Sequence, residues 1–179
     1  MAVRKSIKNL SIEKIRMLGV FNENILNVWA DACTILLEYR KHISPVEFNI
    51  SGAINENTLL DWKTISNNIG FEDLEETAGE AGYGISLLIA TEIAELIPVS
   101  RRAKGDGVDI VCSKEVKDDE NFLNTTQEDY YIECKGTRSR DYVKRYLNNG
   151  IQQSKNAPGN VYVISTEFES PSALTHFRK

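Results

Sequence analysis

Hydrophobic positions recur at helical spacing between residues 22 and 41. The apolar side chains of this stretch would share one face of a helix: Ile25, Leu26, Trp29, Cys33, Leu36 and Leu37. Such a stripe is typical of an amphipathic helix that packs one side against a core. The pattern therefore predicts a long helix in the first quarter of the chain.

A second helix is predicted over residues 58–68. It would begin with the Thr-x-x-Asp capping signal of Thr58 and Asp61 and would end at Gly70. The segment 44–50 stays open, because it contains a helix-start signal and also an apolar alternation that suits a strand. Residues 1–70 are accordingly expected to form a helical N-terminal subdomain.

From residue 71 the pattern changes to that of an α/β core, which we expect to extend to residue 179. A well-buried helix is followed by three short apolar strands, a polar helix and a last strand that is apolar on both faces. Because a helix precedes this last strand, it should lie parallel to a neighbour in a mixed central sheet flanked by helices. The expected elements are Leu74–Leu96, Ile97–Arg102, Val108–Cys112, Tyr130–Lys135, Arg140–Lys155 and Val161–Ser165.

The stretch between the second and third of these strands is polar and strongly charged. Residues 113–129 include a run of acidic side chains and few large apolar ones. Such a composition favours a loop that leaves the sheet. We therefore expect an acidic insert here.

Composition and cysteine usage narrow the class of protein. The chain has 41% hydrophobic and 26% charged residues and a net charge of −5, which is ordinary for a soluble globular protein. No apolar run approaches the length of a membrane span, and none follows Met1–Lys8 as in a secretory signal, so a cytoplasmic location is expected. Three scattered cysteines and two isolated histidines favour buried thiols over a zinc site or disulfides.

The residues with most chemical meaning are Asp109, Glu133 and Lys135. On a strand, Glu133 and Lys135 share one face about 6.6–6.8 Å apart, while Cys134 points the other way. An acid and a base on an otherwise apolar strand are costly to bury unless something pairs with them. A divalent cation beside Glu133, with Asp109 supplied by the adjoining strand, would be such a partner, and carboxylate oxygens suit Mg²⁺ or Mn²⁺.

Basic and glycine residues lie directly before the Asp109 strand. Gly105 and Gly107 would allow a sharp turn and a close approach of the backbone to a ligand. The cations Arg101, Arg102 and Lys104 precede them and are expected to contact phosphates. A net negative charge does not conflict with this expectation, because local potential matters more than the total.

The sequences Gly-Asp-Gly-Val-Asp-Ile, from Gly105, and Ile-Glu-Cys-Lys-Gly, from Ile132, resemble the core motifs of the PD-(D/E)XK, or restriction-endonuclease-like, superfamily. Within it they are closest to Mrr-type restriction endonucleases and archaeal Holliday-junction resolvases. The order helix, three strands, helix, strand is also similar to the core of that superfamily. The resemblance covers about residues 74–165; the N-terminal third and the acidic insert are departures from it.

This resemblance implies a metal-dependent endonuclease of the restriction, defence or repair type that hydrolyses DNA. Asp109, Glu133 and Lys135 would be the metal-binding and catalytic trio, with Mg²⁺ as cofactor and Mn²⁺ as its substitute. Glu80 would be the additional glutamate that the family carries on the helix before the first strand, ahead of Glu76 and Glu92. The glutamine of the second helix would be Gln152 or its neighbour Gln153.

Several alternatives stay open at this stage. Arg138 and Arg140 are candidates for nucleic-acid binding, but a solvated helix face explains them comparably well. RNA is an alternative substrate, as in an RNase or a toxin-like nuclease, and a non-catalytic binding module is an alternative of another class. A homodimer would suit cleavage of both strands of a duplex.

Overall fold

The computed structural model describes residues 8–63, 73–102, 107–117 and 125–179. Within these ranges eight strands form one mixed sheet, in the order β1-β3-β2-β8-β7-β6-β5-β4. The strands are β1 (Lys8–Ser11), β2 (Val46–Gly52), β3 (Glu56–Asp61), β4 (Ile97–Arg101), β5 (Ile110–Lys117), β6 (Thr125–Thr137), β7 (Asn160–Glu167) and β8 (Ser172–Arg178). The protein is therefore of the α/β class.

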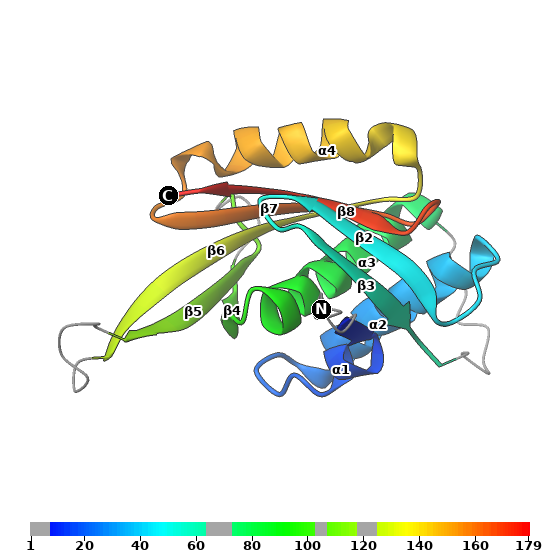
Figure 1. Ribbon diagram of the computed structural model, residues 1–179, viewed down its shortest axis with the longest axis horizontal. Helices are drawn as coiled ribbons and strands as arrows, with labels where there is room; N and C mark the ends of the chain where they lie inside the picture. Colours follow the sequence, from blue (N-terminus) through cyan, green and yellow to red (C-terminus); the bar gives the residue numbers. More distant parts are fainter. Residues whose placement is uncertain (1–7, 64–72, 103–106, 118–124) are drawn as a thin grey trace, which may run out of the picture.

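The helices cover the two faces of the sheet unequally (Figure 1). One face packs against α3 (Leu74–Leu88), which in turn contacts α2 (Glu23–Tyr39) and the short α1 (Glu13–Arg16), while α4 (Arg140–Gln153) lies on the opposite face. A π-helical turn (Ile89–Ile93) continues α3, and a 3-10 turn (Ser154–Asn156) continues α4. The large hydrophobic core lies on the α3 side, and a smaller cluster around Val161 and Val163 lies under α4.

The predicted order of elements after residue 71 is confirmed as far as β7, and β8 is a further strand that the sequence did not predict. α3 is followed by β4, β5 and β6, then by α4 and β7. β4, β5 and β6 are antiparallel neighbours, whereas β7 pairs in parallel with β6 after the α4 crossover. β7 is covered on both faces and is buried along most of its length, as its apolar sequence predicts.

The prediction of a mainly helical N-terminal third is wrong for the described residues. Only α1 and α2 are helical there, and Thr58–Asp61 belongs to β3, so the capping signal has no helix to cap. The expected end of that helix, residues 64–70, lies outside the described residues. The segment left open is strand β2, whose Phe48 and Ile50 point into the core. Because β2 pairs with β8, these strands extend the same sheet.

The acidic insert is also mostly regular structure. Ser113–Lys117 continues β5 and pairs in antiparallel register with Thr125–Asp129, which opens β6. The two strands form a long hairpin that projects beyond the rest of the sheet (Figure 1). Its charged side chains are compatible with strands because little else packs on them, so polarity alone was a poor indicator of a loop.

Glycines allow α3 to lie unusually close to β6. A Cβ at Gly82 would approach the backbone nitrogen of Gly136 to 2.6 Å, and one at Gly136 would approach the carbonyl oxygen of Ala78 to 1.7 Å. Both contacts are with backbone, which cannot move aside cheaply. α3 begins at Asp73, whose side chain caps the helix by accepting from the backbone N–H groups of Glu75 and Glu76. The close packing brings the middle of α3 to the strand that carries Glu133 and Lys135.

The three cysteines, Cys33, Cys112 and Cys134, are buried free thiols, as predicted. Burial raises the pKa of Cys112 to about 12, so this thiol stays protonated at neutral pH. In the parts of the chain that the structure describes, none of the helices has the length and apolar character needed to cross a bilayer.

Candidate active site

A cavity of about 510 Å³ lies where β4, β5 and β6 meet the middle of α3 and the end of α4. Four of its lining residues, Glu80, Asp109, Glu133 and Lys135, are those singled out by the sequence for chemistry. Two more, Arg101 and Arg102, are the cations expected to meet phosphates. The remaining lining residues are Tyr83, Gly107, Val108 and Gln153.

Asp109 lies directly before β5, where the pairing of β5 with β6 begins. Its backbone N–H donates to the carbonyl of Ile132 at 2.8 Å, and its carbonyl accepts from the N–H of Arg102 at 2.8 Å. Its carboxylate then accepts from the backbone N–H of Cys134 through Oδ2 at 2.7 Å. The carboxylate thus accepts a hydrogen bond that the backbone carbonyl of a neighbouring strand would otherwise accept. The backbone of β6 therefore orients the side chain of Asp109.

The second oxygen of Asp109, Oδ1, accepts a hydrogen bond of 2.7 Å from the hydroxyl of Tyr83. Tyr83 comes from α3, on the opposite side of the strand from Glu133. Burial, together with this carboxylate, raises the pKa of Tyr83 well above its usual value, so the phenol is a permanent donor. Asp109 is therefore held by one backbone and one side-chain donor.

Glu133 and Lys135 project from the same face of β6, as strand geometry predicts. The ammonium of Lys135 is ion-paired with Oε1 of Glu133. α4 lies directly above them because residue 150 is glycine. A Cβ there would come within 3.3 Å of Glu133 Cγ and 2.6 Å of a methyl group of Val163.

Glu133 is only 4% exposed, and its carboxyl group interacts with a second acid, Asp109. Desolvation raises its pKa to about 7, and the charge of Asp109 adds to this rise; the ion pair with Lys135 opposes it but does not cancel it. Two acids held together in a partly desolvated cavity repel each other. A cation placed between them would relieve this repulsion.

Glu80 lies one helical turn before Tyr83, on the same side of α3. Its Oε2 accepts a 2.7 Å hydrogen bond from the indole N–H of Trp29 on α2. Trp29 is fully buried, as expected for a packing residue. Glu76, the weaker candidate, is exposed and does not line the cavity, and Glu92 is ion-paired with Lys14 at 2.5 Å.

Arg101 is the last residue of the edge strand β4, Arg102 follows it, and their side chains contact different aromatic rings. The guanidinium of Arg101 lies 5.2 Å from the ring centre of Tyr83 and 5.7 Å from that of Trp29. The guanidinium of Arg102 lies 5.7 Å from the ring centre of Tyr131. Aromatic faces attract cations, so the rings hold both arginines at the cavity.

Tyr83 and Trp29 are site residues that the sequence reasoning missed. Tyr83 follows Glu80 by three positions, a spacing that puts both side chains on one helix face, so it could have been found. No sequence signal connects Trp29 with the site, because its contact with Glu80 spans 51 positions and depends on how α2 packs on α3.

The remaining candidates are distributed as follows. Gln153 lines the cavity, whereas Gln152 lines a separate cavity of about 120 Å³ on the other side of the last turn of α4. Lys104 lies outside the described residues. Arg138 and Arg140 lie beyond the cavity lining, at the end of β6 and the start of α4.

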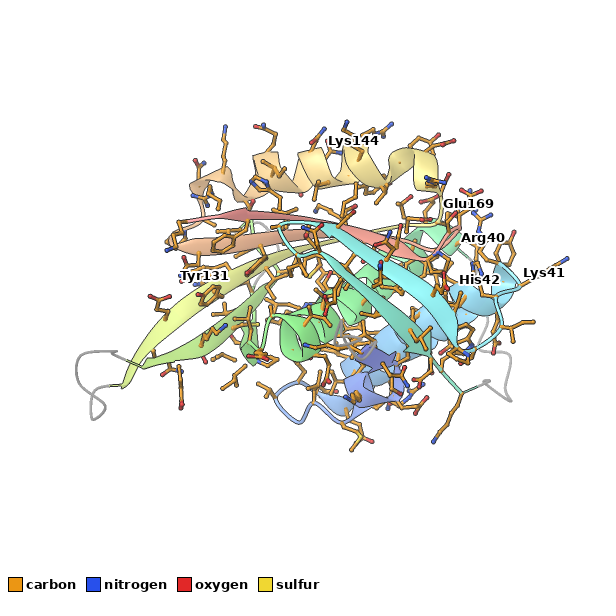
Figure 2. All side chains as sticks on the ribbon, in the orientation of Figure 1. Arg40, Lys41, His42, Tyr131, Lys144 and Glu169 are labelled. Carbon is orange, nitrogen blue, oxygen red and sulfur yellow. The ribbon has the colours of Figure 1, made fainter. Side chains whose placement is uncertain are left out.

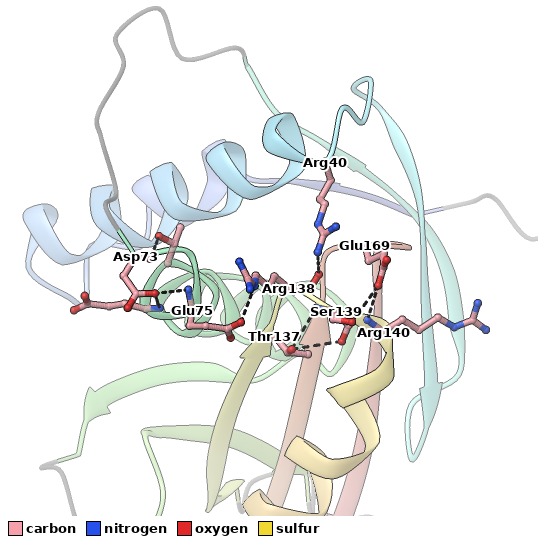
Figure 3. A network of polar contacts seen from close by, with 10 residues as sticks. Arg40, Asp73, Glu75, Thr137, Arg138, Ser139, Arg140 and Glu169 are labelled. Atoms are coloured by element: carbon pink, nitrogen blue, oxygen red, sulfur yellow. Dashed lines mark hydrogen bonds and ion pairs between the residues drawn. The ribbon is translucent and has the colours of Figure 1, made fainter.

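Arg138 and Arg140 belong to a polar network that joins three elements (Figure 3). Arg138 is ion-paired with Glu75 of α3 at 2.6 Å, and its carbonyl accepts from Arg40 at the end of α2. The backbone N–H of Arg140 donates to Glu169, which thereby caps α4. In this structure both residues have clear structural contacts, and a role in nucleic-acid binding stays a prediction.

The arrangement of acids leaves room for a metal without forming a ready-made metal site. Among the described residues, no three His, Cys, Asp or Glu side chains converge closely enough to hold an ion as they stand. Each acid already has a partner: Lys135 for Glu133, Tyr83 for Asp109 and Trp29 for Glu80. Nevertheless, the donor set fits a hard divalent cation, because it offers carboxylate oxygens and includes two acids that repel each other.

Comparison of the chain with protein-family models, with curated proteins and with solved structures found no significant match.

Proposed function

We propose that this protein is a divalent-metal-dependent nuclease that hydrolyses phosphodiester bonds in DNA. The observation that carries the proposal is the shared cavity of Asp109, Glu133 and Lys135, three residues from two adjoining strands, with arginines at its rim. The resemblance of the two motifs to the PD-(D/E)XK superfamily, and the order of elements around them, support it further.

Asp109 and Glu133 would hold the metal, with Glu80 contributing directly or through water. When bound, Mg²⁺ or Mn²⁺ supplies a water of lowered pKa and neutralises charge that develops on the phosphate. The protein supplies the orientation of the acids. Asp109 is locked by the Cys134 N–H and the Tyr83 hydroxyl, and Glu133 is kept in place beneath α4 by the close approach at Gly150.

Lys135 has the position that charge stabilisation requires. Its ammonium is on the same strand face as Glu133 and lines the same cavity, and it is compact enough to approach a phosphate oxygen. It would donate to the attacking water or to the phosphate oxygens as negative charge grows on them. Preorganised donors of this kind act most strongly where water is partly excluded.

The substrate is assigned as a polyanion because two arginines border the acids. Arg101 lies beside the ring of Tyr83 and Arg102 beside the ring of Tyr131, so each can contact a different phosphate along a strand of nucleic acid. The overall charge of −5 argues against indiscriminate binding. A weak general affinity with local contacts at the cavity is therefore expected.

The test is a cleavage assay with wild type and the Lys135→Met variant, which keeps the length of the side chain and removes its charge. Supercoiled plasmid, linear duplex, single-stranded DNA and RNA are incubated with Mg²⁺, Mn²⁺ or EDTA. We expect metal-dependent cutting of DNA by the wild type and at least a hundredfold slower cutting by the variant.

The matched control is Lys41→Asn. Lys41 is an exposed lysine with a φ of 60°, which asparagine tolerates, and it lies far along the molecule from Tyr131, the ring beside Arg102 of the cavity (Figure 2). It should cut like wild type. Preference for RNA would revise the substrate, whereas equal activity of the Lys135 variant would refute the assigned site. A wild type that neither cuts any substrate nor gains thermal stability from metal would favour a binding module.

A further inference from the structure

Two aromatic rings stack against each other on the α3 side of the cavity. Trp29 of α2 and Tyr83 of α3 have ring centres 5.3 Å apart and planes inclined by only 7°. The guanidinium of Arg101 lies within 6 Å of both ring centres. Phe21 packs edge-on against the other side of Trp29 at 5.7 Å. The rings are therefore held on several sides by neighbours.

Each ring of this pair donates a hydrogen bond to a different acid of the cavity. The indole N–H of Trp29 donates to Glu80 Oε2 at 2.7 Å, and the hydroxyl of Tyr83 donates to Asp109 Oδ1 at 2.7 Å. These are the polar atoms of two side chains that otherwise pack as hydrophobic bodies. The stack thus connects the acid of α3 with the acid before β5.

The packing of α2 on α3 makes this connection rigid. Residue 84 is glycine, and a Cβ there would approach the carbonyl oxygen of Trp29 to 3.2 Å and the Sγ of Cys33 to 3.0 Å. The helices therefore touch at the level of the stack. Trp29 is fully buried, so its N–H has lost water as a partner and depends on Glu80.

We propose that Trp29 and Tyr83 are positioning residues that act as one unit, holding Glu80 and Asp109 at a fixed separation for metal binding. This inference rests on the proposed function. Residues that orient metal ligands from behind commonly change affinity ten- to hundredfold when their hydrogen bond is removed. Through Trp29, α2 would also contribute to the site, although α2 lies before the part of the chain that resembles the nuclease core.

The first test follows Trp29 directly. The chain has two tryptophans, so the Trp62→Phe variant leaves Trp29 as its only indole. Titration of this variant with Mg²⁺ should change the fluorescence of Trp29, with the same midpoint as calorimetric binding, because Glu80 is shared between the indole and the metal. Glu80→Gln in the same background should abolish the fluorescence change. A purely structural Trp29 would give no response in either protein.

The second test removes each hydrogen-bond donor while keeping an aromatic ring at the position. Tyr83→Phe and Trp29→Phe should each weaken Mg²⁺ binding, measured by calorimetry, about ten- to hundredfold. In DNA cleavage each variant should show a large fall in kcat and only a small change in KM. Tyr162→Phe is the matched control, since Tyr162 packs against Phe177 with ring planes inclined by 36° and does not line the cavity; this variant should bind metal like wild type. Thermal unfolding in EDTA checks that each variant is folded.

A double-mutant cycle separates positioning from general damage. If Trp29 acts through Glu80, then Trp29→Phe should have little further effect on metal affinity in a Glu80→Gln background. Additive losses would overturn the inference, and so would unchanged affinity in both single variants. A wild type that binds no metal would instead refute the proposed function, so the two failures give different results.

Discussion

Two glutamates are buried on neighbouring strands, and their surroundings differ sharply. Glu167, at the end of β7, is completely buried and accepts three hydrogen bonds, from the backbone N–H groups of Glu169 and Ser170 and from the hydroxyl of Ser172, at 2.8–3.0 Å. Glu133, on β6, is 4% exposed, and within the described residues its hydrogen-bond donor is Lys135, while Asp109 repels it.

The two glutamates differ in how well the protein replaces the water that each carboxylate loses. The donors around Glu167 replace the water that its carboxylate loses, and they close the turn between β7 and β8. Among the described residues Glu133 has no comparable set of donors. Its pKa is raised because Lys135 does not offset the desolvation and the charge of Asp109. The fold thus tolerates an unfavourable charge at the position where a metal and a phosphate would make it favourable.

The largest expected effect is on catalysis at Glu133. Glu133→Gln keeps the shape of the side chain but removes a metal-binding charge, so kcat for DNA cleavage should fall by about a thousandfold or more. Unfolding in EDTA should show no loss of stability, because repulsion from Asp109 is removed together with the ion pair to Lys135. Activity within tenfold of wild type would remove Glu133 from the mechanism.

The opposite pattern is expected at Glu167. In Glu167→Gln, an amide group would face three donors that need an acceptor, so the free energy of unfolding should fall by about 3 kcal/mol. The kcat of the folded fraction should stay near that of wild type, since Glu167 does not line the cavity. Denaturant unfolding and single-turnover cleavage measure the two quantities, and a selective loss of kcat would contradict the distinction.

A smaller effect should appear in the pH dependence of the metal-free protein. The pKa of Glu133 is about 7 in the fold, above its ordinary value of 4.5, so between these values the folded state keeps a proton that the unfolded chain has lost. This group therefore makes the fold less stable as pH rises from 4.5 to 7, by about 2–3 kcal/mol. Denaturant unfolding in EDTA across this range should show the slope, and Glu133→Gln should reduce it relative to wild type.

The smallest effect is expected for the exposed ion pair of Arg138 and Glu75. Their side chains are 41% and 51% exposed, so water and salt screen the attraction. Arg138→Ala should change the free energy of unfolding by less than about 0.5 kcal/mol. If Arg138 also contacts substrate, the salt dependence of DNA binding will become shallower in the variant; an unchanged salt dependence would leave its role purely structural.

The strand that carries Glu133 and Lys135 could be predicted from sequence because the information for it is local. Strand alternation alone places Glu133 and Lys135 on one face and Cys134 on the other, and the apolar run of β7 identifies a covered strand. Prediction from local sequence was wrong where pairing with another segment determines the secondary structure. Thr58 and Asp61 carry a capping signal, yet pairing with β2 makes them part of a strand.

The second wrong prediction concerns the polar and charged residues 113–129. Ser113–Asp129 was expected to be a loop because it is polar, but a two-stranded hairpin that projects from the sheet has little need for apolar side chains. The contact between Trp29 and Glu80 was out of reach for a different reason, since it arises from the packing of two helices that are far apart in sequence. Local pattern thus located the acids, and only tertiary packing revealed what holds them.

The parallel pairing of β2 with β8 has a consequence for the timing of folding. Asn49 lies beside Ser172 and Gly52 beside Thr175, so β2 cannot complete its place in the sheet until a segment some 120 residues later has been synthesised. Contacts of such sequence separation are slow to form. During translation β2 and its partner β3 would remain without β8, the strand that joins them to the rest of the sheet. Chaperone demand should therefore be greatest in the interval before β8 emerges.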